Sequence, residues 1–238
     1  MHDTYTTTSA SATATTAVDK NAKPTVEDSN LKKRPLMTKS AVCRLLAELV
    51  KSYGSCAKLI TDHVYESGLS DLIKEDTTAL AFMLDELLIG SASSDKESSQ
   101  LVKTLIAALS SCNHYPDAQT TLVSEVKSAL ARALALHESN LKHTKIQALT
   151  GLILTMIESC PSSQSHQSTL AAYKQHQYNM NNIVKIMLKR GLVTDLARVA
   201  HSLDLSSPNV SATINAVLKP LETLSRIVNQ PSPLATTR

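Results

Sequence analysis

Apolar residues recur at intervals of three and four along most of the chain, and this spacing limits the possible fold more than any other feature. The first clear stretch contains Val42, Leu45, Leu46, Leu49, Val50 and Tyr53. Such intervals place side chains on one face of an α-helix. No stretch of four or more residues alternates cleanly between apolar and polar side chains, so no β-strand is predicted.

The composition agrees with a helical fold. Of the 238 residues, 42% are hydrophobic, which is enough to build a core. Glycine occurs only five times, phenylalanine once and tryptophan not at all. Few glycines and few aromatics argue against a β-sandwich, a barrel or a glycine-looped nucleotide-binding domain. We therefore expect an all-α protein.

Residues that begin or end helices divide the periodic pattern into a series of short and long helices. The signals for a helix start are Thr38 or Ser40, Asp76, Pro116, Ser139 and Ser207-Pro208. The signals for an interruption or an end are Gly54, Gly68, Gly90, Cys160-Pro161 and Gly191. The second helical pattern, from Cys56 through Val64, is expected to continue until Gly68.

Three regions of different composition are expected. Residues 1–30 are rich in Thr, Ser and Ala with few large apolar side chains, and are predicted to form a disordered arm. Residues 31–230 are expected to form the helical segment, with polar loops near 91–99 and 161–170. Residues 231–238 contain proline and are predicted to be a flexible tail.

One phrase recurs and suggests a repeat architecture. The sequence GLSDLI begins at Gly68, and the similar GLVTDL begins at Gly191. The two lie 123 residues apart, which equals three spacings of 41. Armadillo and HEAT repeats are about 40 to 47 residues long. An armadillo/HEAT-like solenoid segment is therefore the predicted architecture, and a compact helical bundle is the alternative.

The search for catalytic, cofactor-binding or metal-binding residues gives none. The sequence contains no HExxH, P-loop, GxSxG or GxGxxG motif. His137, Glu138 and His143 lack the four-residue spacing of a helical zinc site, so we expect solvated or partly buried histidines. The cluster of Cys112, His114 and Asp117 is explained equally well by a turn before Pro116.

Basic residues provide the only candidate for a surface contact. Lys185, Lys189 and Arg190 gather at one predicted helix end, where cations also favour the helix dipole. The net charge is only +3 and the chain has few aromatics, so a nucleic-acid partner is not expected. No uncharged apolar run approaches the ~18 residues of a membrane span, so no membrane partner is expected either.

The cysteines and the N-terminus indicate in which cellular compartment the protein is expected. The four cysteines contain no CxxC pair, and the N-terminus has no apolar signal-peptide region. We therefore expect free, mostly buried thiols in a protein that is not secreted. The expected location is the cytoplasm, and also the nucleus if the basic residues 32–34 act as an import signal.

Several longer stretches resemble a known family. They are LKKRPL from Leu31, RLLAELVKSY from Arg44, LIKEDTTALAFMLDELL from Leu72, DAQTTLVSEVKSALARALA from Asp117, MIESCPS from Met156, and above all the run from Met180 to Ser232. They are similar to a mid-chain segment of the giant HECT-type E3 ubiquitin ligases that also carry UBA and WWE domains. The resemblance implies an armadillo-like solenoid that is part of a longer ligase.

The same resemblance implies that this segment is not itself catalytic. HECT ligases use a cysteine that carries ubiquitin as a thioester. None of Cys43, Cys56, Cys112 and Cys160 lies in a sequence like the HECT catalytic loop, and the UBA, WWE and HECT domains are not in this sequence.

The expected function is therefore a non-catalytic scaffold that positions substrates for ubiquitin transfer performed elsewhere on a parent ligase. Its expected partners are protein substrates and the neighbouring repeats of that ligase. The alternative is a free-standing helical-repeat adaptor that binds proteins. An adaptor should have polar outer faces on its end helices, whereas the last predicted helix stays apolar to its end, with Leu221, Leu224, Ile227 and Val228. Within that helix Leu218 is expected to be a core residue.

Overall fold

A computed structural model describes residues 37–68, 73–89, 96–160 and 181–229 of the chain. The chain divides into two units, Met1–Leu36 and Met37–Arg238, and all described residues lie in the second unit. The arm predicted at 1–30, the loop near 161–170 and the tail at 231–238 lie outside the described residues.

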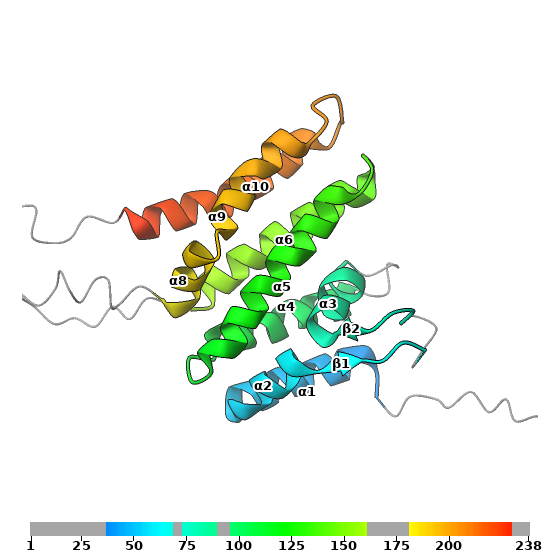
Figure 1. Ribbon diagram of the computed structural model, residues 1–238, viewed down its shortest axis with the longest axis vertical. Helices are drawn as coiled ribbons and strands as arrows, with labels where there is room; N and C mark the ends of the chain where they lie inside the picture. Colours follow the sequence, from blue (N-terminus) through cyan, green and yellow to red (C-terminus); the bar gives the residue numbers. More distant parts are fainter. Residues whose placement is uncertain (1–36, 69–72, 90–95, 161–180, 230–238) are drawn as a thin grey trace, which may run out of the picture. The chain divides into compact units, whose positions relative to one another are not determined.

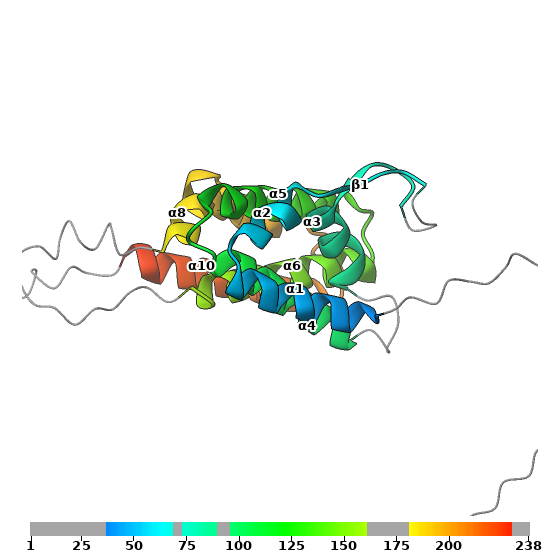
Figure 2. The same ribbon diagram turned by 90° about the horizontal axis from the view of Figure 1, so that it is seen from below.

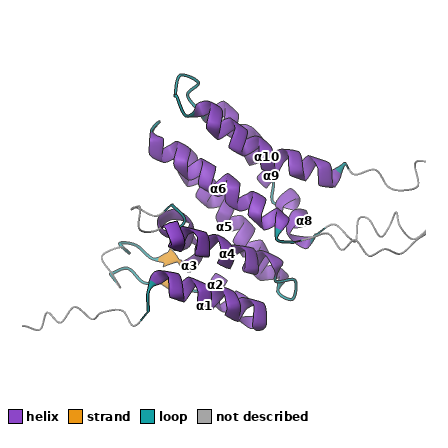
Figure 3. Cartoon of the chain, turned by 180° about the vertical axis from the view of Figure 1, so that it is seen from behind, coloured by secondary structure: helices purple, strands orange, loops and turns teal. Residues whose placement is uncertain are grey.

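Most of the described residues are helical and only one two-stranded sheet accompanies the helices, which confirms the all-α prediction (Figures 1 and 3). In chain order the elements are α1 (Lys39–Ser52), α2 (Ser55–Asp62), β1 (Val64–Tyr65), β2 (Thr77–Thr78), α3 (Ala79–Phe82), the π-helix η1 (Met83–Leu87), α4 (Lys96–Ser111), α5 (Pro116–Ala135), α6 (Asn140–Glu158), α8 (Asn182–Lys189), α9 (Leu192–Val199), the 3₁₀-helix η3 (Ala200–Ser202) and α10 (Val210–Val228).

The helices of the second unit form two stacked rows (Figure 2). In one row α1 packs on α4, α4 on α6, and α6 on α10. In the other row α5 packs against α2, α3, α8 and α9. Helices α4, α5 and α6 alternate between the rows, α8 and α9 both lie in the row of α5, and α10 returns to the row of α6. This alternation, with contacts mainly between neighbours, is typical of stacked helical repeats.

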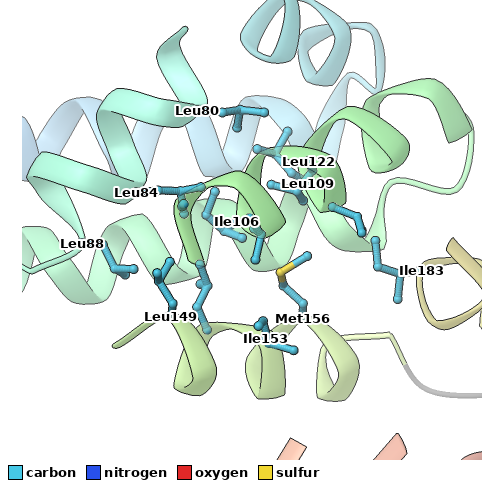
Figure 4. Close-up of a cluster of buried hydrophobic side chains, with 14 of the residues drawn as sticks. Leu80, Leu84, Leu88, Ile106, Leu109, Leu122, Leu149, Ile153, Met156 and Ile183 are labelled. Atoms are coloured by element: carbon cyan, nitrogen blue, oxygen red, sulfur yellow. The ribbon is translucent and has the colours of Figure 1, made fainter. Parts of the chain in front are cut away.

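The core lies between the two rows (Figure 4). Side chains from α3, η1, α4, α5 and α6 point toward one another there, and Leu152 and Ile153 of α6 are completely buried. The largest buried side chains are aliphatic, which matches the scarcity of aromatic residues: Leu80, Leu84, Leu88, Leu105, Ile106, Leu109, Leu122, Leu130, Ile146, Leu152, Ile153 and Met156.

Several predicted helix boundaries are confirmed. The Thr38 hydroxyl accepts a hydrogen bond from the backbone N–H of Ala41, and Ser139 does the same for Lys142. These bonds satisfy amides that have no partner within the helix. Pro116 lies in the first turn of α5. Gly191 ends α8 with a φ of 73°, a left-handed conformation that favours glycine.

The prediction of no strand is wrong at one place. Helix α2 ends at Asp62, and Val64–Tyr65 pair antiparallel with Thr77–Thr78 instead of continuing the helix to Gly68. Valine and threonine suit a strand, and the left-handed Gly68, whose N–H donates to the Ile73 carbonyl, closes the turn.

Two further expectations need correction near this hairpin. The N-cap of α3 is Thr78, whose hydroxyl accepts from the Ala81 amide, while Asp76 instead accepts from the Ser67 amide. The two glycines of the recurring phrase are both left-handed, but Gly68 lies in a strand-linking turn and Gly191 between helices. The phrase therefore does not mark equivalent positions of a repeat.

Helix α4 also begins earlier than predicted. It starts at Lys96, so residues 96–99, which we expected in the loop near 91–99, are helical. The serines of this turn find partners on other elements: the Ser98 hydroxyl lies 3.2 Å from that of Ser40, and the Ser99 hydroxyl donates to the Leu88 carbonyl. These bonds offset the weak helix propensity of serine.

Candidate protein-interaction surfaces

The predicted basic contact residues lie at the C-terminal end of α8. Lys189 and Arg190 are exposed and Lys185 is half-buried. The structure brings a fourth basic residue to this end, because Lys127 of α5 donates to the Arg190 carbonyl at 2.9 Å and forms an ion pair with Asp195 at 3.2 Å. Lys127 holds the turn between α8 and α9 in place. Sequence reasoning missed it because it lies far away along the chain.

Helix α1 carries two apolar rows, and only one of them is buried. Its core face consists of Cys43, Ala47 and Val50, with Leu46 packed against the core. The second row remains on the surface: Val42 is 39% exposed, Leu45 48% and Tyr53 64%. The single apolar face that we expected from Val42 to Tyr53 is therefore divided between core and surface.

Helix α10 shows the same division at the other end of its row. Thr213, Val217, Pro220 and Leu224 are buried. Leu218, which we expected in the core, is 53% exposed, and Val228 is 45% exposed. Ile214, Leu221 and Ile227 are partly buried between these two faces. The expectation for Leu218 is wrong because the buried face of α10 begins one residue earlier in each turn.

A polar cluster around a buried histidine joins the first turns of α6 to the start of α10. Its centre is His143, which is only 1% exposed. The Nδ1 atom of His143 lies 2.8 Å from the Thr213 hydroxyl, which also accepts a hydrogen bond from Gln147. The Nε2 atom contacts Glu138 Oε1 and lies 2.9 Å from the Ser207 hydroxyl. We call these five residues the His143 node.

The His143 node is structural in geometry. In a catalytic triad the acid and the nucleophile contact different ring nitrogens of the histidine. Here Glu138 and Ser207 contact the same nitrogen, so the carboxylate competes with this hydroxyl instead of orienting the ring toward it. The Thr213 hydroxyl contacts the other nitrogen, but Thr213 is completely buried and its hydroxyl donates to the Asn209 carbonyl, so a substrate cannot reach it. The node therefore links three segments: the turn before α6, helix α6, and the start of α10.

The electrostatics of the node centre on Glu138. Burial opposes ionisation of this carboxyl group, but hydrogen bonds from His143 and Lys142 outweigh it and lower the pKa of Glu138. The Lys142 ammonium lies 3.3 Å from Glu138 Oε2 and also donates to the Ser202 carbonyl at 3.4 Å. Lys142 is only 6% exposed, so this lysine ties η3 to α6 from within the protein.

A second ionic cluster holds the π-helix η1 against α5. Arg132 lies 2.7 Å from Asp85 and 2.9 Å from Glu125. Burial alone would lower the pKa of Arg132, but the two carboxylates raise it. Asp85 is thus committed to a structural ion pair, whereas the adjacent Glu86 is exposed.

The four cysteine thiols are unpaired and mostly buried. All four cysteines are free, and Cys43, Cys112 and Cys160 are buried, which confirms the expectation from the sequence. Burial raises the pKa of the Cys43 thiol, which favours the unreactive protonated form. Within residues 37–68, 73–89, 96–160 and 181–229, no group of three His, Cys, Asp or Glu residues could hold a metal ion. None of the helices in these ranges is both long and apolar enough to cross a membrane.

Comparison with known proteins shows to which proteins the chain is related in sequence. No family model matches the chain. Over 220 residues, 91% of its length, the chain is 52% identical to the E3 ubiquitin-protein ligase HUWE1 of Mus musculus. The protein of the same name from Rattus norvegicus matches to the same extent. The chain spans only 5% of the length of these relatives. It is thus related in sequence to one short segment of a much longer E3 ubiquitin-protein ligase, which confirms the resemblance indicated by its sequence.

Proposed function

We propose that the chain is a non-catalytic scaffold segment of a HECT-type E3 ubiquitin ligase, acting in protein ubiquitination. The observation that carries the proposal is the pair of exposed apolar rows on α1 and α10. These two helices lie at opposite ends of the row that runs through α4 and α6. A stacked array that ended at these helices would need polar outer faces to remain soluble. Apolar end faces are expected where further helices continue the stack.

The length of the related ligase, compared with the length of this chain, supports the same proposal. The chain is 52% identical to a segment that makes up 5% of a ubiquitin ligase. In a parent protein of that length, neighbouring helices would cover Leu45 on one side and Leu218 on the other. The proposed partners of these faces are therefore the adjacent repeats of the parent chain.

Ubiquitin transfer itself is proposed to occur elsewhere on the parent. A HECT cysteine must be exposed to receive ubiquitin from the E2 enzyme and to reach a substrate lysine. Cys43, Cys112 and Cys160 are buried, and Cys56 is only partly exposed on α2. The segment would instead position protein substrates, and the exposed cations Lys189 and Arg190, together with Lys185, are the proposed contact residues. The proposed location is the cytoplasm and the nucleus.

One experiment separates the scaffold from the free-standing adaptor. An antibody against residues 180–230 is used to blot a lysate of the source organism, and the recognised protein is then immunoprecipitated. The expected result is a band far larger than 25.7 kDa that forms a reducible ubiquitin adduct with E1, E2, ubiquitin and ATP. A band at 25.7 kDa without that adduct would favour the adaptor.

A second measurement tests the non-catalytic assignment directly. The 238-residue chain is incubated with the same ubiquitination components, and no thiol-linked ubiquitin is expected on it. An adduct lost in a Cys56→Ser variant would assign catalysis to this chain and overturn the proposal.

A further inference from the structure

The segment between η3 and α10, residues 203–209, is mostly exposed and is attached to the rest of the protein at only a few residues. Leu203 is buried at its start, but Leu205 is 73% exposed, and Ser206 and Pro208 are also exposed. Ser207 lies between them and is half-buried. Loops of this kind, with exposed side chains on a rigid scaffold, are accessible to other proteins.

Ser207 attaches this loop to α6 through the His143 node. Its hydroxyl lies 2.9 Å from His143 Nε2, the same atom that contacts Glu138. The loop continues directly into α10, where Thr213 contacts the other ring nitrogen of His143. Asn209 adds a surface bond to Asn140 at the start of α6. The Ser207 hydroxyl thus makes one of the few hydrogen bonds that hold the start of α10 against α6.

We propose that Ser207 is a phosphorylation site for a proline-directed serine/threonine kinase, and that its phosphate releases the loop at 203–209 and the first turn of α10 from α6. The residue after Ser207 is Pro208, which is exposed and which disfavours the helical conformation at Ser207. A serine followed by proline is the dipeptide that this class of kinase accepts. In the transfer, Ser207 Oγ attacks the γ-phosphorus of ATP, an Oγ–P bond forms and the bond from that phosphorus to the β,γ-bridging oxygen breaks. ADP leaves, and the hydroxyl proton passes to the base of the kinase.

The charge of the product explains the release. A phosphoserine carries about −1.5 to −2 charges at pH 7. At its present place the phosphate would stand against Glu138, whose carboxylate already occupies His143 Nε2. The ammonium group of Lys142, beside the node, is already bonded to Glu138 and to the Ser202 carbonyl.

The confined surroundings of His143 also favour release of the phosphorylated loop. His143 is 1% exposed, so its nitrogen offers no room for a group larger than a hydroxyl. The phosphate must therefore turn toward solvent. The hydrogen bond between Ser207 and His143 is lost in that movement.

The first test uses the full chain, a purified proline-directed kinase and ATP, with phosphate positions read by mass spectrometry. The sequence offers an internal control, because Ser232 also precedes a proline, Pro233. The expected result is phosphate on Ser207 and on Ser232, with Pro208→Ala removing only the first. Complete modification of Ser232 with none on Ser207 would overturn the proposal.

The second test asks whether the phosphate acts as a switch. Amide hydrogen exchange is compared between the phosphorylated chain and the Pro208→Ala chain treated with the same kinase. Exchange in residues 210–213 is expected to be at least about tenfold faster with phosphate on Ser207, while exchange in α5 stays unchanged. An unphosphorylated Ser207→Ala chain separates the loss of the hydroxyl from the effect of charge, and should show a smaller increase. Unchanged exchange in the phosphorylated chain would refute the switch.

Discussion

Two adjacent residues of α10 provide a sharp test of which face of this helix belongs to the fold. Val217 is 3% exposed and Leu218 is 53% exposed, although both are aliphatic and both lie in the middle of the helix. Substitution by Asp gives a matched pair of variants, because each places the same poor helix former and the same charge at almost the same position. Only the surroundings of the new carboxylate differ.

The expected losses follow from burial. Val217→Asp removes a fully buried side chain, worth about 1.5–3 kcal/mol, and places a carboxylate among apolar groups at a cost of several kcal/mol. The unfolding free energy should therefore fall by about 4 kcal/mol or more. Leu218→Asp loses only about half of the burial of a leucine, plus up to about 0.7 kcal/mol of helix propensity, so its loss should be about 1–2 kcal/mol.

The difference is large enough for a standard denaturation experiment. Urea unfolding followed by far-UV circular dichroism is suitable, since the chain contains no tryptophan for fluorescence. A gap of about 3 kcal/mol corresponds to a difference in Tm of roughly 6–12 °C for a domain of this size. Equal losses in the two variants, or a larger loss for Leu218→Asp, would refute the assignment of the buried face.

Three further predictions concern the interior. Thr213→Val should lower the unfolding free energy by about 1–3 kcal/mol in urea, because His143 and Gln147 lose a buried partner, whereas Thr223→Val, whose hydroxyl bonds only its own helix at Lys219, should change it little. With Ellman's reagent on the native chain, Cys56 should react first and Cys43 slowly, because burial of Cys43 raises its thiol pKa; a fast, complete reaction of all four thiols would contradict the described core. The pKa of Glu138 is lowered on folding, so its stabilisation is present above the unfolded pKa of about 4.3 and is lost as pH falls through the lower, folded value. Between pH 6 and 3, wild type should therefore lose more unfolding free energy than Glu138→Gln, and equal losses would contradict this.

Much of the fold follows from periodicity and capping residues. The boundaries near Thr38, Pro116, Ser139 and Gly191 could be predicted because each depends on local chemistry: a hydroxyl for a free amide, a fixed φ, or a left-handed turn. Local chemistry does not determine which of two apolar rows on a helix will be buried against a neighbouring helix. On α1 the row from Val42 to Tyr53 satisfied the helical spacing as a whole, but only part of it faces α4.

The remaining features depend on contacts that are distant in sequence. The His143 node joins Thr213 to a histidine 70 positions earlier, and Lys127 reaches the Arg190 carbonyl across 63 positions. No pattern in a single sequence predicts contacts between such distant residues. The short hairpin of Val64–Tyr65 was missed for another reason, because two residues are too few for alternation to be recognised.

The alternation of helices between two rows has a consequence for how such a chain acquires its structure. Helix α10 packs on α6 and α9, and α4 packs on α1, so each of these helices finds its partners among helices that precede it in the chain. During synthesis, an array of this kind can add helices to a finished edge while the rest of the polypeptide is still on the ribosome. A very long ligase built from such segments would then present only its newest apolar edge to the cell at any moment.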